Sequence, residues 1–262
     1  MFISHIDPVI MQLGPITIRY YGVLFLLGVI FTALVSYYLI RKKGVDMKPE
    51  EVFELTVWLG FGVIIGARLF YIIVYNFSYY SHNLNKLFAI NEGGLSFHGG
   101  LIGMILAGYL YCRVYKKDFL ELADIVAIPV AIGICFVKLA NFINSELVGR
   151  ISNVSWAFNF NNETDKAGNL VFRHPSQLYE ASKNVVIFGI MWILKDKNMK
   201  KGSLFSIFLM LYASFRFIVE FFRMPDPQLM WLYQATGFSM GQYLCMIMFC
   251  FGLGLYLWVN RK

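Results

Sequence analysis

Charged side chains lie within otherwise apolar stretches of the sequence, at spacings that would gather them for anion binding. Arg216, Glu220 and Arg223 recur at i, i+4 and i+7, which places them on one face of a helix. Lys138 and Asn141 share a face of another helix at i and i+3. Cations that are only partly balanced by acids suit a phosphate. Arginine suits it best, because its guanidinium binds two oxygens at once.

Further polar residues in apolar stretches are candidates for the same site. His98 stands between the glycine pairs Gly93–Gly94 and Gly99–Gly100, where the backbone could approach a ligand closely. Arg68 and Glu180 each lie one or two turns inside a stretch that would otherwise be in lipid. An ionisable group in a span costs about 2.5–3.5 kcal/mol on insertion scales, so each of these residues needs an explanation.

Structural explanations stay open for these residues. Arg68 could snorkel to the headgroups, and Glu180 could pair locally with Lys183 at i+3. The three charges between positions 216 and 223 could form a purely structural triad, and His98 could be an ordinary hydrogen-bonded side chain at the interface.

The sequence contains none of the common signatures for metal, nucleotide or nucleophilic sites. Its four histidines are far apart and have no H-x-x-x-H spacing. A G-x-S-x-G elbow, a Walker loop and a dinucleotide fingerprint are missing as well. The four cysteines have no C-x-x-C spacing and lie in or beside apolar stretches, as buried thiols do. We therefore expect no bound metal.

The composition requires these side chains to be held by membrane helices. Of 262 residues, 58% are hydrophobic and only 15% are charged, and the mean hydropathy is +0.59. These values exclude a soluble fold and a disordered chain. The net charge of +7 does not indicate nucleic-acid binding, because no basic run lies on a soluble module. We predict an all-α polytopic bundle that forms one integral membrane domain over residues 1–262.

Seven apolar stretches are long enough to cross a bilayer, which takes about 20 residues. Each must be a helix, since lipid offers no hydrogen-bond partner for an open backbone edge. Alternate connections hold 13 Lys and Arg against 5, which predicts that the N-terminus is outside and the C-terminus inside. The first stretch lacks the features of a cleaved signal peptide and is expected to remain. The predicted spans are Ile18–Ile40, Phe53–Tyr75, Phe97–Val114, Leu122–Ile143, Ser176–Leu194, Leu204–Phe222 and Met240–Val259.

The candidate residues all fall in the outer halves of the predicted helices. Residues that snorkel independently would populate both leaflets, whereas a shared cavity places them on one side. We therefore predict a polar cavity that opens to the outside and has an excess of positive charge. Glu54 and Asp124 lie at the inner edge, where we expect the loops to solvate them.

Two segments between the spans are expected to have structure of their own. Residues 149–173, between the fourth and fifth spans, are polar and are predicted to form a small extracytoplasmic subdomain. A hairpin is expected there around Trp156–Phe160 and Leu170–Phe172. The stretch Ser78–Ile90 is equally consistent with an interfacial segment and with a plain loop.

Several of these strings, taken in order, resemble the bacterial phosphatidylglycerol–prolipoprotein diacylglyceryl transferase family. The resemblance runs from Arg19 to Gln242, and four matching strings on separate helices make it specific. The strings are Gly93-Gly94-Leu95-Ser96-Phe97-His98-Gly99-Gly100, Asn141-Phe142-Ile143-Asn144 with Glu146 and Gly149-Arg150, His174-Pro175-Ser176-Gln177-Leu178-Tyr179-Glu180, and Arg216-Phe217 with Glu220 and Arg223.

The resemblance implies an enzyme of the bacterial plasma (inner) membrane whose active site faces the extracytoplasmic side. Such an enzyme transfers the diacylglyceryl group of phosphatidylglycerol to the lipobox cysteine thiol in the signal peptide of a preprolipoprotein. It forms a thioether, releases glycerol 1-phosphate and uses no cofactor. The resemblance makes His98 a candidate proton acceptor and Arg216 and Lys138 the cations that handle phosphate. The remaining matching positions would form the site, namely Tyr21, Asn141, Glu146, Gly149, Glu180, Glu220 and Arg223.

One position departs from the family in a way that affects chemistry. The family typically reads Gly-Arg-x-Gly-Asn-Phe-Ile-Asn where this chain has Val137-Lys138-Leu139-Ala140 before Asn141. Lys138 keeps the positive charge but lacks the two-pronged donor geometry of arginine. We therefore predict weaker activity than an arginine at this position would support.

Three other functions stay open on the sequence. A transporter or channel could admit an anion from outside, although the inner halves of the spans have almost no polar residues for a path. A membrane enzyme could act on lipid headgroups without a peptide acceptor. A catalytically weakened relative of the transferases is the third, for which Lys138 is the evidence.

Overall fold

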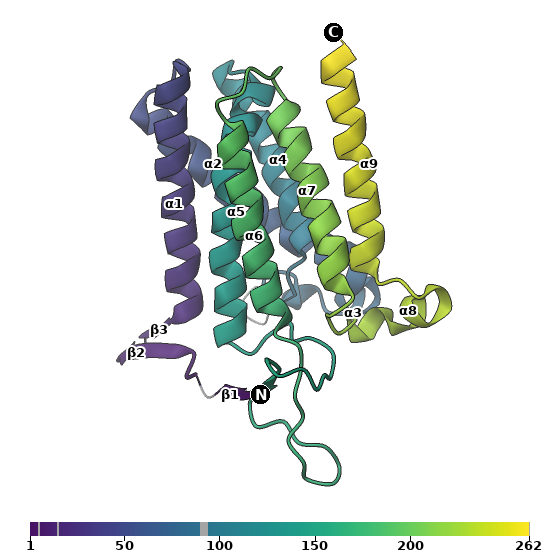
Figure 1. Cartoon of the computed structure of the whole chain (residues 1–262). Helices are drawn as coiled ribbons and strands as arrows, with labels where there is room; N and C mark the ends of the chain where they lie inside the picture. Colours follow the sequence, from purple (N-terminus) through teal and green to yellow (C-terminus); the bar gives the residue numbers. More distant parts are fainter. Residues whose placement is uncertain (5, 15, 90–93, 262) are drawn as a thin grey trace.

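The apolar stretches of the sequence form helices, because a helix satisfies its own backbone hydrogen bonds. The structure is a computed structural model that describes residues 1–4, 6–14, 16–89 and 94–261. Its long helices are shown in Figure 1. They are α1 (Tyr20–Lys43), α2 (Pro49–Phe70), α4 (Phe97–Tyr115), α5 (Phe119–Ile143), α6 (Ser176–Leu194), α7 (Ser203–Glu220) and α9 (Met240–Arg261).

The predicted class, a polytopic helical membrane protein, is confirmed. In the described part of the chain, six helices are long and apolar enough to cross a membrane, with α2 and its π-helical continuation η1 (Tyr71–Tyr75) counted as one. Helix α6 is similar in length but more polar, since it carries Glu180, Lys183 and Asn184. The count of seven spans and their orientation in the membrane stay predictions.

Successive long helices run in opposite directions, as Figure 1 shows. The starts of α4 and α6 and the ends of α5 and α7 therefore lie at the same end of the bundle. The N-terminus lies near this end and the C-terminus at the other. The closest helix pairs are α2 with α4, α1 with α5, α7 with α9, and α5 with α6.

Short elements cover the end of the bundle near the N-terminus. Strand β2 (Val9–Leu13) pairs antiparallel with β3 (Ile16–Arg19) through a turn at Gly14, whose φ is +60°. The first helix begins at Tyr20 and not at Ile18, because residues 18 and 19 belong to β3. The shorter helices are α3 (Phe77–His82), η2 (Leu84–Lys86), η4 (Pro227–Leu229) and α8 (Met230–Thr236). The stretch Ser78–Ile90 thus contains helical turns, and its last residue lies outside the described residues.

The polar segment 149–173 contains the expected antiparallel pairing. Phe158 and Arg173 exchange backbone hydrogen bonds of 2.9 and 2.8 Å, and Thr164 forms a bridge with Leu170. Strand β4 (Phe158–Phe160) also pairs in parallel with β1 (Phe2–Ser4). The Arg173 guanidinium donates two hydrogen bonds of 2.6 Å to the Glu163 carboxylate, which hold the pKa of Glu163 below its ordinary value.

Glycines bring α2 and α4 into close contact. A Cβ atom added to Gly66 would lie 2.7 Å from the Cα of Gly103, and one added to Gly62 would lie 2.6 Å from the Cβ of Ala107. The facing pairs Gly62-x-x-x-Gly66 and Gly99-x-x-x-Gly103 have the spacing by which small residues let membrane helices approach closely. Side-chain volume at these positions would separate the two backbones.

Asp124 differs from its predicted environment. It is buried, and its carboxylate accepts hydrogen bonds of 2.7 Å from the backbone N–H groups of Gly202 and Phe205. These donors lie at the start of α7, where a helix leaves N–H groups without partners inside the helix. Asp124 therefore caps α7 from α5, and the prediction that loops solvate it was wrong.

Candidate functional site

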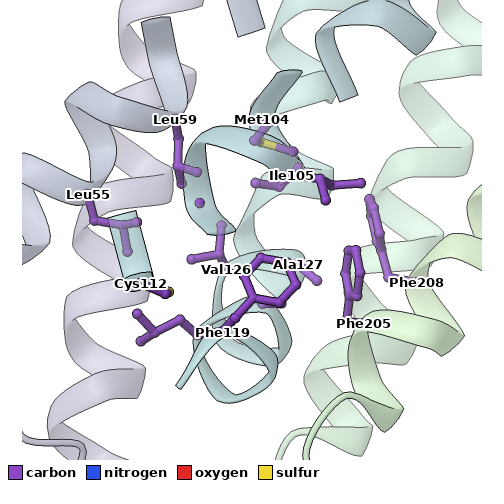
Figure 2. A pocket seen from close by; sticks show the side chains of 14 residues that line it. Leu55, Leu59, Met104, Ile105, Cys112, Phe119, Val126, Ala127, Phe205 and Phe208 are labelled. Carbon is purple, nitrogen blue, oxygen red and sulfur yellow. The ribbon is translucent and has the colours of Figure 1, made fainter. Parts of the chain in front are cut away.

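Two of the cavities between the described helices differ in chemistry. Figure 2 shows the larger one, about 480 Å³ of space between α2, α4, α5 and α7, with side chains such as Leu59, Val126 and Phe208 around it. Its lining is apolar, and the only heteroatoms of its described side chains are the sulfur atoms of Met104 and Cys112. The smaller cavity, about 210 Å³, lies where α5, α6 and α7 meet at the N-terminal end of the bundle. Its lining residues are Lys138, Asn141, Leu147, Ser176, Gln177, Glu180, Arg216 and Arg223.

Arg216 lies at the centre of the charge network at the smaller cavity. Its Nη1 contacts Oε1 of Glu180 on α6 at 2.8 Å, and its Nη2 contacts Oε2 of Glu220 one turn further along α7 at 2.6 Å. Glu220 also accepts a hydrogen bond of 2.9 Å from the Ser239 hydroxyl and contacts Arg223 at 3.5 Å. These contacts fix the plane of the guanidinium, and they include the triad spacing that the sequence indicated.

Glu180 joins helices α5, α6 and α7. Its Oε2 lies 3.7 Å from Nζ of Lys138 on α5 and 3.6 Å from Nζ of Lys183 on α6. Each of these side chains is at most 11% exposed, so solvent screens the pairs little. Asn141 is buried one turn from Lys138 and lines the same cavity.

His98 lies in the first turn of α4, next to this network. The turn is capped by Ser96, whose hydroxyl accepts a hydrogen bond of 3.3 Å from the backbone N–H of Gly99. The adjacent Phe97 ring stacks on Tyr212 of α7, with ring centroids 4.7 Å apart. His98 Nε2 is buried and has no hydrogen-bond partner among the residues that the structure describes. The charged groups that act on the imidazole are Arg216, Glu220, Lys138 and Arg223.

Arg68 contacts the backbone of a neighbouring chain segment. Among the bonds to described residues, its guanidinium donates hydrogen bonds of 2.6 to 3.3 Å to the backbone carbonyls of Lys86, Leu87, Ala89 and Gly94. It does not belong to the lining of the smaller cavity. Arg68 therefore holds the backbone at residues 86, 87, 89 and 94, and its contact with a substrate stays a prediction.

The glycines beside His98 also have a structural role. A Cβ atom on Gly99 would collide with Phe70 and with the carbonyl of Gly66, both on α2, and one on Gly100 would meet Val63 at 3.4 Å. The structure therefore shows a close approach between two helices at these glycines, and their approach to a ligand stays a prediction. Gly93, the first residue of this string, lies outside the described residues.

Three further predicted residues lie around the site and not in the lining of its cavity. Gly149 packs where three segments meet, since a Cβ there would lie 2.7 Å from the carbonyl oxygen of Phe222 and 2.7 Å from the Cβ of His174. Glu146 is exposed, and its side chain accepts a hydrogen bond of 3.2 Å from Asn144. Tyr21, half-buried at the start of α1, interacts electrostatically with Glu146.

Sequence reasoning missed Tyr212 and Ser239, whereas Lys183 was named only as a local partner of Glu180, a pair that the structure contains. Tyr212 is 1% exposed, and its hydroxyl has no hydrogen-bond partner in the described ranges. Nζ of Lys183 lies 3.5 Å from the centroid of the Tyr212 ring, a cation–π contact. The four-residue spacing of Tyr212 and Arg216 was the available signal for the tyrosine, because it puts both on one face of α7.

The ion pairs of the described site join four cations to three carboxylates. The cations are Lys138, Lys183, Arg216 and Arg223, and the acids are Glu180, Glu220 and Asp226. One positive charge is left over, which matches the single negative charge of a phosphodiester. No group of three or more His, Cys, Asp or Glu among the described residues could hold a metal ion.

The chain is similar along its whole length to proteins of one family. The family model for prolipoprotein diacylglyceryl transferase matches residues 8–258. The chain is 43% identical over 267 residues to the phosphatidylglycerol–prolipoprotein diacylglyceryl transferase of Geobacter sulfurreducens, covering 100% of this chain and 98% of that protein. It is 39% identical over 259 residues to the proteins of the same name from Pseudomonas paraeruginosa and Legionella pneumophila, covering 98% of this chain and 95% and 98% of theirs.

Proposed function

Because the chain belongs to the prolipoprotein diacylglyceryl transferase family, we propose that its cavity at Lys138, Glu180 and Arg216 binds the phosphate of phosphatidylglycerol. As a member of this family the protein is a membrane transferase that acts in lipoprotein maturation. The observation that carries the proposal for the site is the network in which four cations face three carboxylates, all of them buried except Arg223 and Asp226 at its edge.

The proposed reaction replaces one bond to a glyceryl carbon by another. The thiolate of the lipobox cysteine attacks the carbon of phosphatidylglycerol that bears the phosphate, because the thiolate and not the thiol is the nucleophile. A carbon–sulfur bond forms while the carbon–oxygen bond breaks, and the electron pair leaves with glycerol 1-phosphate. Negative charge grows on the phosphate as this bond breaks. Arg216 and Lys138, already fixed by Glu180 and Glu220, would stabilise that charge without reorganising.

We assign His98 the role of proton acceptor for the cysteine thiol. His98 is buried in the first turn of α4, and imidazole is the side chain that most often serves as a general base. Its Nε2 has no hydrogen-bond partner in the described part of the chain, so a thiol proton could reach it. The phosphate cations and the base lie on different helices, α4, α5 and α7, and so could bind the two substrates from different sides.

We further propose that the chain spans the bacterial inner membrane seven times, with this site toward the extracytoplasmic side. The support is the excess of Lys and Arg in the connections at the other end of the bundle, which favours the cytoplasm. The substrate is a preprolipoprotein signal peptide with a lipobox cysteine, and it enters from the bilayer together with the lipid.

The decisive experiment combines purified protein, phosphatidylglycerol and a lipobox peptide. Formation of a thioether-linked diacylglyceryl peptide, absent with a cysteine-to-serine peptide, is the expected result. Consumption of lipid without peptide product would replace the proposal by a headgroup enzyme. Neither product, together with uptake of an anion into vesicles, would replace it by a transporter.

The role of His98 is tested in the same assay. His98→Gln keeps a polar side chain of similar size, and we expect turnover to fall about a hundredfold or more, in the range for loss of a general base. His82→Gln is the matched control, because His82 is exposed on α3. Unchanged turnover of His98→Gln would assign proton transfer to another group.

A further inference from the structure

Lys183 is a buried cation to which the proposed reaction gives no role. Its side chain is 3% exposed and lies one turn after Glu180 on α6. Besides the carboxylate at 3.6 Å, Nζ contacts the Tyr212 ring at 3.5 Å and the Asn184 side-chain oxygen at 3.4 Å. The ammonium of Lys183 is thus compensated by three contacts inside the protein, unlike that of a solvent-exposed surface lysine.

Lys183 and Lys138 share one carboxylate oxygen. Oε1 of Glu180 receives the hydrogen bond from Arg216, and Oε2 lies at nearly equal distances, 3.6 and 3.7 Å, from the two ammonium groups. Oε2 accepts no hydrogen bond from described residues. Glu180 therefore attracts both lysines without binding either one tightly.

The two lysines differ in their access to the cavity. Lys138 belongs to the lining of the smaller cavity, whereas Lys183, in the described structure, does not. A phosphate in the cavity could meet Lys138 and Arg216 directly and would feel Lys183 only through Glu180. Without Lys183, the Glu180 carboxylate would attract the Lys138 ammonium more strongly. Unlike a guanidinium, an ammonium has no second pair of N–H donors that could bind the phosphate while the first binds the carboxylate.

We propose that Lys183 is a positioning residue, which offsets the charge of Glu180 from behind the cavity and so leaves the Lys138 ammonium available to the phosphate of the lipid. This inference rests on the proposed function. It also predicts that the need for Lys183 depends on the residue at position 138. A guanidinium there could donate to Glu180 with one edge and to phosphate with the other.

A double-mutant cycle tests the dependence. We expect Lys183→Met to raise the KM for phosphatidylglycerol about tenfold, with a smaller change in kcat. In the Lys138→Arg background the same substitution should raise KM less than threefold. Lys183→Arg should retain most of the wild-type KM, because it keeps the charge. Equal losses in both backgrounds, or a loss of kcat alone, would overturn the proposal in favour of a structural role.

Lys195→Met is the matched control. Lys195 is the residue that follows the last turn of α6, twelve residues after Lys183. Like Lys183, it makes a cation–π contact, since its Nζ lies 4.3 Å from the centroid of the Trp192 ring. We expect its KM to equal that of the wild type. A similar rise in KM would show that losing any lysine with a cation–π contact raises the KM, and it would overturn the specific role of Lys183.

An anion-binding measurement separates this proposal from the proposed function. The probe is inorganic phosphate, whose binding raises the unfolding temperature of the protein. The readout is the phosphate concentration at which half of the maximal rise is reached. We expect a value about tenfold higher for Lys183→Met than for the wild type. An unchanged value would overturn the role of Lys183 even where thioether product forms. Absence of thioether product with the phosphate effect intact would overturn the function alone.

Discussion

The contact between α2 and α4 offers a sharp test of how the scaffold controls the site. In Gly66→Ala, the new Cβ would lie 2.7 Å from the Cα of Gly103 and would also collide with the carbonyl of Gly99. Both obstacles are backbone, so no side chain can rotate away. Ordinary contact begins at 3.4 Å, so the two helices would have to separate by at least about 0.7 Å.

This displacement falls on the turn that carries His98, because Gly99 is its neighbour. A misplacement of about 1 Å in catalytic geometry can reduce a rate about a hundredfold. We expect Gly66→Ala to lower thioether formation between about tenfold and a hundredfold. Overpacking of this kind should also lower the free energy of unfolding by about 1–3 kcal/mol. Turnover with saturating lipid and peptide, and unfolding in detergent, measure the two effects.

Gly60→Ala is the matched control on the same helix. A Cβ at Gly60 meets nothing within 4 Å, and alanine is favoured over glycine inside a helix by about 0.5–1 kcal/mol. We expect wild-type turnover and equal or greater stability. If Gly66→Ala matched the wild type in both measurements, the close contact between α2 and α4 would not position His98.

Three further predictions concern other contacts. Asp124→Ala leaves the buried N–H groups of Gly202 and Phe205 without an acceptor. The free energy of unfolding, measured in detergent, should therefore fall by about 2–5 kcal/mol. An unchanged free energy of unfolding would contradict the capping role. Lys138→Arg should raise turnover about tenfold or more, because an added charge-assisted hydrogen bond contributes about 1.5–3 kcal/mol; no gain would mean that the second donor edge is not needed. Arg173 lowers the pKa of Glu163 below 4.5, so this pair stabilises the fold above that pH and ceases to do so as the pH falls through the lowered pKa. The difference in unfolding temperature between wild type and Glu163→Gln should therefore be present at pH 6 and shrink in acid, and a difference that grew in acid would refute this sign.

The helices and their polar ends could be predicted from the sequence, because both depend on local patterns. Apolar runs of bilayer length must form helices in lipid, and the spacing of Arg216, Glu220 and Arg223 already puts them on one face. The start of the first helix was predicted two residues too early, at Ile18, because the β2–β3 hairpin includes residues of the same apolar run. Here a backbone ladder, which hydropathy does not detect, decided where the helix begins.

The partners across helices could not be predicted. The local alternative for Glu180, a pair with Lys183, is present, yet Arg216 and Lys138 reach the same carboxylate from α7 and α5. Similarly, polarity alone could not distinguish Arg68 as a holder of carbonyls, or Asp124 as the cap of another helix, from side chains that meet a ligand or solvent.

By itself, the sequence determined that this chain is a polytopic helical membrane protein whose candidate site residues fall near one end of their helices, and its motifs identified the family. Those features depend on hydropathy and on spacings within a single helix. Only the tertiary structure decided that glycines beside His98 face α2 and that one carboxylate, Glu180, holds three cations. The physical reason is that helix packing sets which side chains meet, and packing joins residues too far apart in the chain for any local period to relate them.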